Sequence, residues 1–177
     1  MVIRLILTAG LYLFVSVTHG QVRSIPAIKI SKPVKIDGYL DDDAWRSMEK
    51  TGDFITSQPV FGRPSTHKTD VRIAYDNTAI YVCAYMYQDP ATIRKQLTAR
   101  DVIDRQDVDI FAVGFDTYLD HQNAFIFRVT AANVQGDAKQ SQSGSNNGGV
   151  VTDASWDAVW ESKINIKADG WVAEIRI

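Results

Sequence analysis

Two charged residues stand inside apolar stretches of this sequence, and they are the first candidates for chemistry. Asp109 lies in the stretch VDIFAVGF at 108–115, and Arg128 lies in AFIFRVTAA at 124–132. An unpaired charge among apolar side chains is costly, so each of the two needs an opposite charge or a polar ligand. If the two stretches are neighbouring strands, Asp109 and Arg128 can pair across the sheet. The sequence therefore allows two interpretations, a structural ion pair and a ligand site.

The sequence contains four tryptophans, and their surroundings differ. Trp156 is flanked by Ser155 and Asp157 and follows the polar, low-complexity stretch QSQSGSNNGG at 140–149, which predicts a mobile loop. It is the best candidate for an exposed aromatic platform. We expect core positions for the other three: Trp45, Trp160 and Trp171.

Acidic residues gather in two places that could bind a metal ion, and oxygen ligands of this kind suit calcium. The members are Asp101, Asp104, Asp107 and Asp109 in the first group, and Asp116, Asp120 and Asn123 in the second. Neither group has the spacing of a recognised calcium loop, which favours solvated turns. The sequence has no G-x-S-x-G, no H-E-x-x-H and no glycine-rich phosphate loop, so we predict no catalytic residues.

These residues lie on a chain that reads almost entirely as strands. Apolar and polar residues alternate from 71 to 76, and a continuous apolar run follows at 79–87. Further strands are predicted at 26–30, 34–36, 108–115, 124–132, 156–166 and 171–177. Only 40–49 has a helical pattern. Seven to ten strands without alternating helices predict an all-β antiparallel sandwich with one short N-terminal helix.

Length and charge limit the number of domains and the kinds of partner. The 177 residues suit one domain, and 19 basic against 21 acidic residues give a net charge of −2. This balance argues against a nucleic acid partner. Residues 1–20 combine an early arginine, an uncharged run and a small residue at the end, which predicts a secretory signal peptide. A retained membrane anchor is the alternative. The domain would then be 21–177, and its apolar last strand predicts a longer parent chain.

Several short motifs follow one another along the chain. They are Ile36-Asp37-Gly38 with Leu40-Asp41 and Trp45, Val71-Arg72 with Asp76, Ile80-Tyr81-Val82 with Asp89-Pro90, Val108-Asp109-Ile110-Phe111, Phe127-Arg128-Val129, and Gly170-Trp171 with Glu174. In these motifs and their order, the chain resembles the family 9 carbohydrate-binding modules (CBM9) from about residue 35 to 177. The resemblance implies a jelly-roll-like β-sandwich, in agreement with the strand pattern.

The resemblance also implies a sugar site, in which the ring lies between two tryptophans and polar side chains bind its hydroxyl groups. The strand glutamate of the family falls on Asp109, its arginine on Arg128, and its frequent asparagine on Thr130. Together with Trp156, these are our predicted carbohydrate-binding residues. The first tryptophan of the family falls near Ile103, where this chain has no aromatic residue.

For function, the resemblance implies binding of a polysaccharide or oligosaccharide of the xylan or cellulose type, in proteins associated with glycoside hydrolases. Structural calcium occurs in such modules. It also implies an exported protein, periplasmic, outer-membrane-associated or secreted, with a possible outer-membrane barrel downstream in the same polypeptide. The alternative is an interaction or gating domain that has lost sugar binding. A glycoside hydrolase in its own right ranks third, because no catalytic pattern supports it.

Overall fold

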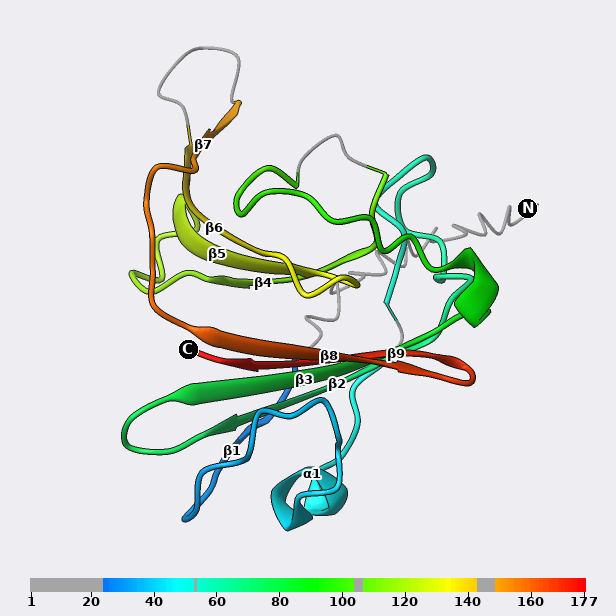
Figure 1. The fold of residues 1–177 in the computed structure, drawn as a ribbon. Coiled ribbons are helices and arrows are strands. Elements are labelled where there is room, and N and C mark those ends of the chain that lie inside the picture. The colour runs from blue at the N-terminus through cyan, green and yellow to red at the C-terminus, as the bar shows by residue number, and fades with distance from the viewer. Residues whose placement is uncertain (1–23, 53, 104–106, 143–148) are drawn as a thin grey trace, which may run out of the picture.

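The computed structural model describes residues 24–52, 54–103, 107–142 and 149–177, and it shows two stacked β-sheets (Figure 1). This confirms the predicted all-β sandwich. The strands pair in antiparallel fashion except β1 and β2, which are parallel. The predicted signal peptide, 1–20, and residues 143–148 of the predicted mobile loop lie outside the described residues.

The larger sheet has five strands in the order β1-β2-β3-β9-β8 and the smaller has four, in the order β4-β5-β6-β7. The first sheet comprises β1 (Ala27–Lys29), β2 (Thr69–Tyr75), β3 (Ile80–Tyr87), β8 (Glu161–Lys167) and β9 (Gly170–Arg176). The second comprises β4 (Ile110–Phe115), β5 (Asn123–Thr130), β6 (Gln135–Gln142) and β7 (Val150–Asp153). Among the described residues, the helices are α1 (Asp43–Ser47) and the 3₁₀ turn η1 (Pro90–Thr92), and neither is long and apolar enough to cross a membrane.

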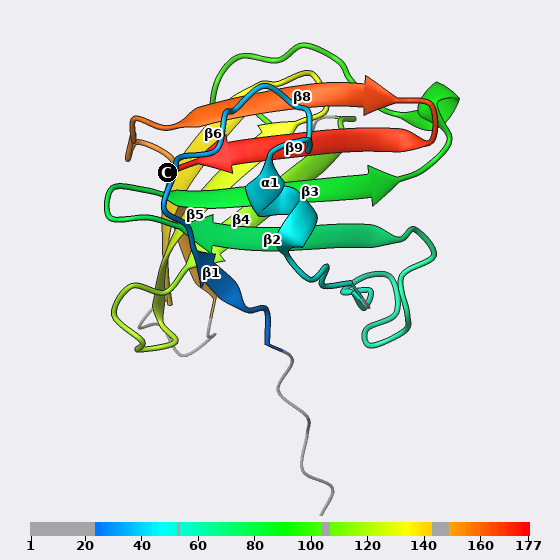
Figure 2. The ribbon, with the colours of Figure 1, turned by 90° about the horizontal axis from the view of Figure 1, so that it is seen from below.

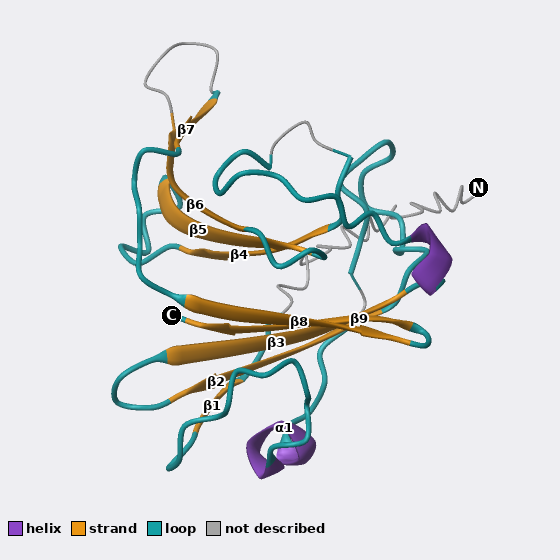
Figure 3. Ribbon diagram, in the orientation of Figure 1, coloured by secondary structure: helices purple, strands orange, loops and turns teal. Residues whose placement is uncertain are grey.

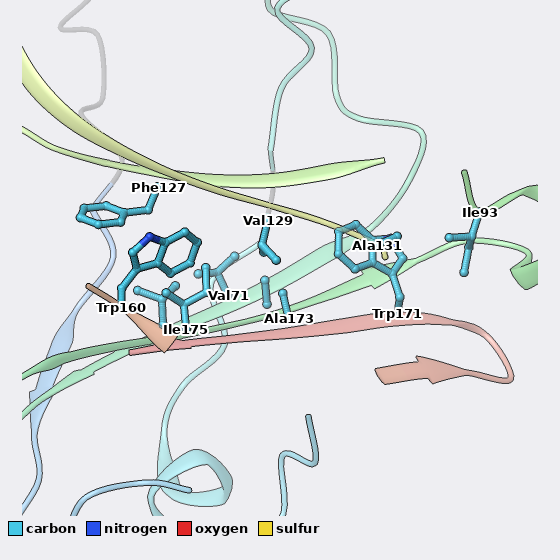
Figure 4. Close-up of a cluster of buried hydrophobic side chains, with 11 residues drawn as sticks. Val71, Ile93, Phe127, Val129, Ala131, Trp160, Trp171, Ala173 and Ile175 are labelled. Atoms are coloured by element: carbon cyan, nitrogen blue, oxygen red, sulfur yellow. The ribbon is translucent and has the colours of Figure 1, made fainter. Parts of the chain in front are cut away.

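The main core lies between the two sheets, as the close-up in Figure 4 shows. Phe127 and Val129 reach into it from β5, while Trp171 and Ile175 reach into it from β9. Trp160, just before β8, packs edge-on against Phe127 with ring centroids 5.4 Å apart. The predicted core positions of Trp160 and Trp171 are therefore confirmed.

A second apolar cluster covers the opposite face of the five-stranded sheet, where α1 lies (Figures 2 and 3). Trp45 on α1 is fully buried there, together with Tyr81 and Cys83 of β3. Burial raises the pKa of the Cys83 thiol to about 11, so the thiol stays protonated at neutral pH. The core role predicted for Trp45 is confirmed.

Several predicted boundaries are wrong. Residues 34–36 form no strand, α1 is shorter than 40–49, and 156–160 lead into β8 without belonging to it. The sequence pattern also missed β6 and β7. β6 reads QGDAKQSQ and has no apolar alternation, because part of its inward-facing row is polar and satisfied by hydrogen bonds.

Candidate functional site

Arg128 lies on the outer face of the four-stranded sheet, turned away from the main core. Its neighbours along β5, Phe127 and Val129, point into the core, so the residue between them points outward. The cross-strand neighbours of Arg128 are Ala112 on β4 and Gly136 on β6. We call the surface formed by these three residues the Arg128 face. The Arg128 side chain is half-buried there, and its Nε and Nη2 atoms are shielded from solvent.

Asp109 precedes β4, which does pair with β5 as expected, but the register does not bring it opposite Arg128. The backbone N–H of Ala131 donates to the Asp109 carbonyl at 2.9 Å, so Asp109 and Ala131 are opposite each other. The Asp109 carboxylate accepts hydrogen bonds from Gln88 Nε2 at 2.7 Å and from the Arg94 backbone N–H at 3.1 Å. The expected cross-strand arrangement of Asp109 with Arg128 is therefore wrong, and Asp109 ties the segment after β3 to β4.

Thr130 shares the outward row of Arg128 but is fully buried. Its Oγ1 accepts hydrogen bonds from the backbone N–H groups of Ala132 at 3.3 Å and Val134 at 3.1 Å, which closes the turn between β5 and β6. Ile103 is fully buried as well and packs over Gly136, where an added Cβ would lie 2.9 Å from its Cδ1. The segment that carries Ile103 thus covers this end of the outer face.

Trp156 lies at the other end of the sandwich, between β7 and β8, and is half-buried rather than openly exposed. Its ring is 4.8 Å from the Phe125 ring and 5.9 Å from the Phe127 ring, measured between centroids. Lys139 Nζ lies 5.9 Å from the Trp156 ring centroid and 5.5 Å from that of Phe125. Trp156 therefore extends the core toward a cationic surface group.

The four predicted site residues consequently occupy three places. Arg128 and Thr130 share one face of the sheet, Asp109 contacts the segment after β3, and Trp156 belongs to an aromatic group at the far end. Of the four, Arg128 lies on the outer face of the sheet, but its side chain is half-buried and its Nε and Nη2 atoms are shielded from solvent. Their sequence positions do not by themselves define one continuous site.

A buried carboxylate that the sequence pattern left without a partner joins three of the motif segments. Glu174 on β9 is fully buried, and its Oε2 accepts from the backbone N–H groups of Gly38 at 2.6 Å and Asp37 at 3.1 Å. Trp45 Nε1 donates to Oε1 at 2.7 Å. Burial raises the pKa of Glu174, and these hydrogen bonds oppose that rise. The cluster holds the N-terminal segment and α1 on the sheet.

A second buried carboxylate, Asp137 on β6, was not singled out from the sequence. It is fully buried and accepts from the Ala158 backbone N–H at 2.6 Å and from Trp160 Nε1 at 3.2 Å. Arg100 Nη2 lies 2.6 Å from its Oδ1 and 2.8 Å from Asp157 Oδ1. This network fastens the crossing from β7 to β8 against β6, and it is structural.

The two acidic groups considered for calcium have structural roles where the structure describes them. In the first group, Asp101 accepts from the Asp137 backbone N–H at 2.9 Å and Asp107 pairs with Arg94, whereas the second group closes turns. The Asp116 carboxylate accepts from the backbone N–H groups of Asp120 and His121, at 3.2 and 2.8 Å. The Asp120 carboxylate accepts from the backbone N–H groups of Gln122 and Asn123. Within the described residues, no group of three or more His, Cys, Asp or Glu side chains is placed to hold a metal ion. Asp104 lies outside them.

Comparison with known proteins shows which solved structures have a similar architecture. No protein-family model matches the sequence, and no curated protein matches it either. Among solved structures, a CBM9 from Caldicellulosiruptor kristjanssonii in complex with glucose is similar, with a TM-score of 0.53 and 21% identity over 87% of this chain and 68% of that one. The chain has a CBM9-like fold. A second structure of such a module from that organism, in complex with cellotriose, has a TM-score of 0.52 and 21% identity over 85% of this chain and 65% of the other.

The chain therefore spans about two thirds of the length of these two structures. In this CBM9-like domain, the motifs that carried the resemblance hold the fold together. Asp76, for example, accepts hydrogen bonds from the Thr78 backbone N–H at 2.6 Å and from the Tyr81 hydroxyl at 2.8 Å, and so closes the β2–β3 turn. Sequence reasoning could have found Glu174 and Trp45 as a pair, because an acid in an apolar strand requires buried donors.

Proposed function

We propose that this domain binds carbohydrate, as a module of an exported protein that acts in the breakdown of xylan- or cellulose-type polysaccharides together with glycoside hydrolases. The observation that carries the proposal is the fold shared with modules whose structures hold glucose and cellotriose. The sequence resemblance also supports it, because the arginine of the family falls on Arg128, and guanidinium N–H groups can bind vicinal sugar hydroxyls. Export is inferred from the signal-peptide pattern at 1–20.

Titration of the full-length protein with glucose, cellotriose and xylotriose tests this function. We expect at least one trisaccharide to bind with a Kd of about 1 mM or lower, equivalent to about −4 kcal/mol. Arg128→Lys keeps the charge but loses the paired donors, and we expect it to weaken binding at the Arg128 face. Arg46→Lys on α1, on the far side of the other sheet, is the matched control. Absence of binding to all three sugars would refute the proposal.

One observation favours a second candidate, an interaction or gating domain that precedes an outer-membrane barrel and binds no sugar. Ile103, at the position of the first family tryptophan, is fully buried over Gly136 and offers no aromatic surface. The same titration separates the two candidates. A domain of this second kind gives no response to any of the sugars, while cross-linking of the full-length protein still detects contacts between the sandwich and the remainder of the polypeptide.

A further inference from the structure

A polar groove lies at the opposite end of β5 from the Arg128 face. It has a volume of about 340 Å³ and runs between the β4–β5 loop and the adjoining parts of β5, β6 and β7. Its lining includes Tyr118, Asn123, Phe125, Lys139, Gln140 and Asp153. Asn123 precedes Arg128 by five residues, which corresponds to about 17 Å along a strand. We call this the Tyr118 groove, and its size falls within the range of about 300–1,000 Å³ typical of small-molecule sites.

One cross-strand row supplies the charged groups of the groove. The register aligns Phe125 on β5 with Lys139 on β6 and Asp153 on β7, so the three side chains share a face. Lys139 Nζ is held above the rings of Phe125 and Trp156 and makes no ion pair in the part of the chain that the structure describes. Asp153 has a lowered pKa because Ser155 donates to it, with a smaller contribution from Lys139, and it is ionised at neutral pH.

The aromatic and amide groups of the groove come from the β4–β5 loop and the strand that follows it. Tyr118 is 70% exposed, and its hydroxyl makes no hydrogen bond to any described residue. Asn123 Nδ2 donates to Asp120 Oδ2 at 2.7 Å, which fixes the amide and leaves Oδ1 as an acceptor for a ligand. Leu119 and His121 both have left-handed backbone conformations, with φ of 53° and 55°. Such conformations are unfavourable for these residue types and are found where a loop shape is specified.

The charge balance selects the ligand class. One ammonium and one carboxylate line the groove, so an anion such as phosphate would gain from Lys139 and lose against Asp153. A neutral ligand with adjacent hydroxyl groups can donate to Asp153, accept from Lys139 and place its C–H face on the Tyr118 ring. A second hollow of about 310 Å³ adjoins the groove through shared Asn123 and Gln140, which gives room for more than one ring.

We propose that the Tyr118 groove is a binding site for a neutral oligosaccharide, separate from the Arg128 face. The ring of Tyr118 stacks on one sugar residue, while Lys139, Asp153 and the Asn123 carbonyl bind its hydroxyl groups. This inference rests on the proposed carbohydrate-binding function and names a place for it that the CBM9 resemblance did not indicate. A chain of two or more sugars is expected to bind more tightly than glucose.

The test uses the full chain with cellotriose, xylotriose, glucose and tri-galacturonic acid as probes, measured by calorimetry and by amide chemical shifts. We expect Tyr118→Ala and Lys139→Met to weaken trisaccharide binding by at least about tenfold, which corresponds to about 1.4 kcal/mol. The control, Tyr39→Ala, removes a 54% exposed tyrosine before α1 and should leave binding unchanged. The side-chain amides of Asn123 and Gln140 should shift on titration.

Each alternative outcome is decisive. If Arg128→Lys abolishes binding while both groove variants bind as the wild type does, the groove proposal is overturned and the proposed function stands. Preference for tri-galacturonic acid over the neutral trisaccharides would overturn the ligand class. If the wild-type chain binds no sugar at all, both proposals fail.

Discussion

Replacement of Glu174 by glutamine is the sharpest test of how this domain is assembled. Three donors, the backbone N–H groups of Asp37 and Gly38 and the indole of Trp45, converge on the two oxygens of a fully buried carboxylate. Glutamine offers one oxygen and one NH₂ group, so in either orientation a donor of the side chain faces a donor of its surroundings. No rotation of the amide satisfies all three partners.

The size of the effect follows from these contacts. Loss of one hydrogen bond to a charged group removes about 1.5–3 kcal/mol, and a buried donor left without an acceptor costs about 1–3 kcal/mol. Removal of a buried charge offsets part of this, in keeping with the raised pKa of Glu174. We expect Glu174→Gln to lower the free energy of unfolding by about 3 kcal/mol in total.

Urea denaturation followed by tryptophan fluorescence measures this change. Glu161→Gln is the matched control, because the Glu161 side chain on β8 is 62% exposed and lies 3.7 Å from Arg176 in a long surface ion pair. We expect the control to change stability by less than about 0.5 kcal/mol. In a Trp45→Phe background the indole donor is absent, so Glu174→Gln should cost about 1–2 kcal/mol less than it does alone. A wild-type-like Glu174→Gln variant, or strict additivity of the two substitutions, would refute the reasoning.

Three further predictions concern backbone space, pH and ion pairing. Gly170→Ala should destabilise the protein by more than about 2 kcal/mol in thermal or urea unfolding, because its φ is +155° and a Cβ would overlap the Met86 carbonyl oxygen. Gly62→Ala, with φ of +84° and open space around it, should lower the free energy of unfolding by about 1 kcal/mol. Equal losses of stability in the two alanine variants would contradict this account. Hydrogen bonds from Thr78 lower the pKa of Asp76 to about 2, so its stabilising effect is present above the ordinary value of 3.8 and is lost as the pH falls through about 2. The stability difference between wild type and Asp76→Asn should therefore shrink from pH 6 toward pH 2, and a constant difference would exclude the mechanism. Arg100→Gln should cost about 1–2 kcal/mol because it removes one of the donors to the buried aspartate of β6, whereas Arg94→Gln, from an exposed pair, should cost less than about 0.5 kcal/mol.

Much of the fold could be predicted because its central strands follow the simplest rules. The strand β3 is apolar on both faces, since the main core covers one face and the α1 cluster covers the other. The continuous apolar run at 79–87 predicts such a doubly covered strand. The motifs that indicated the CBM9 fold are themselves structural contacts. Glu174 with Trp45 and Asp76 with its turn are examples.

The strand β6 could not be predicted because its partners come from distant parts of the chain. Asp137 points inward in a position where an apolar residue would normally stand, and it is tolerated because donors from Arg100, Ala158 and Trp160 reach it. These residues lie 37, 21 and 23 positions away. A pattern within the strand contains no information about such donors, so a polar central strand reads as a loop.

The residues of the candidate site also could not be predicted from local sequence patterns. Asp109 and Arg128 look equivalent in sequence, since each is a charge within an apolar stretch, yet the strand register separates them. Asp109 contacts Gln88 and Arg94, whereas Arg128 lies on the outer face of the sheet with part of its guanidinium buried. Conversely, Tyr118 and Lys139 stand in polar surroundings and carry no sequence signal. They meet in one groove only because the β4–β5 loop folds back over β6. The residues that line a ligand surface on a β-sandwich are brought together by the path of a loop and by the strand register. Such a surface therefore tolerates sequence change more readily than the buried acid clusters that hold the sheets together.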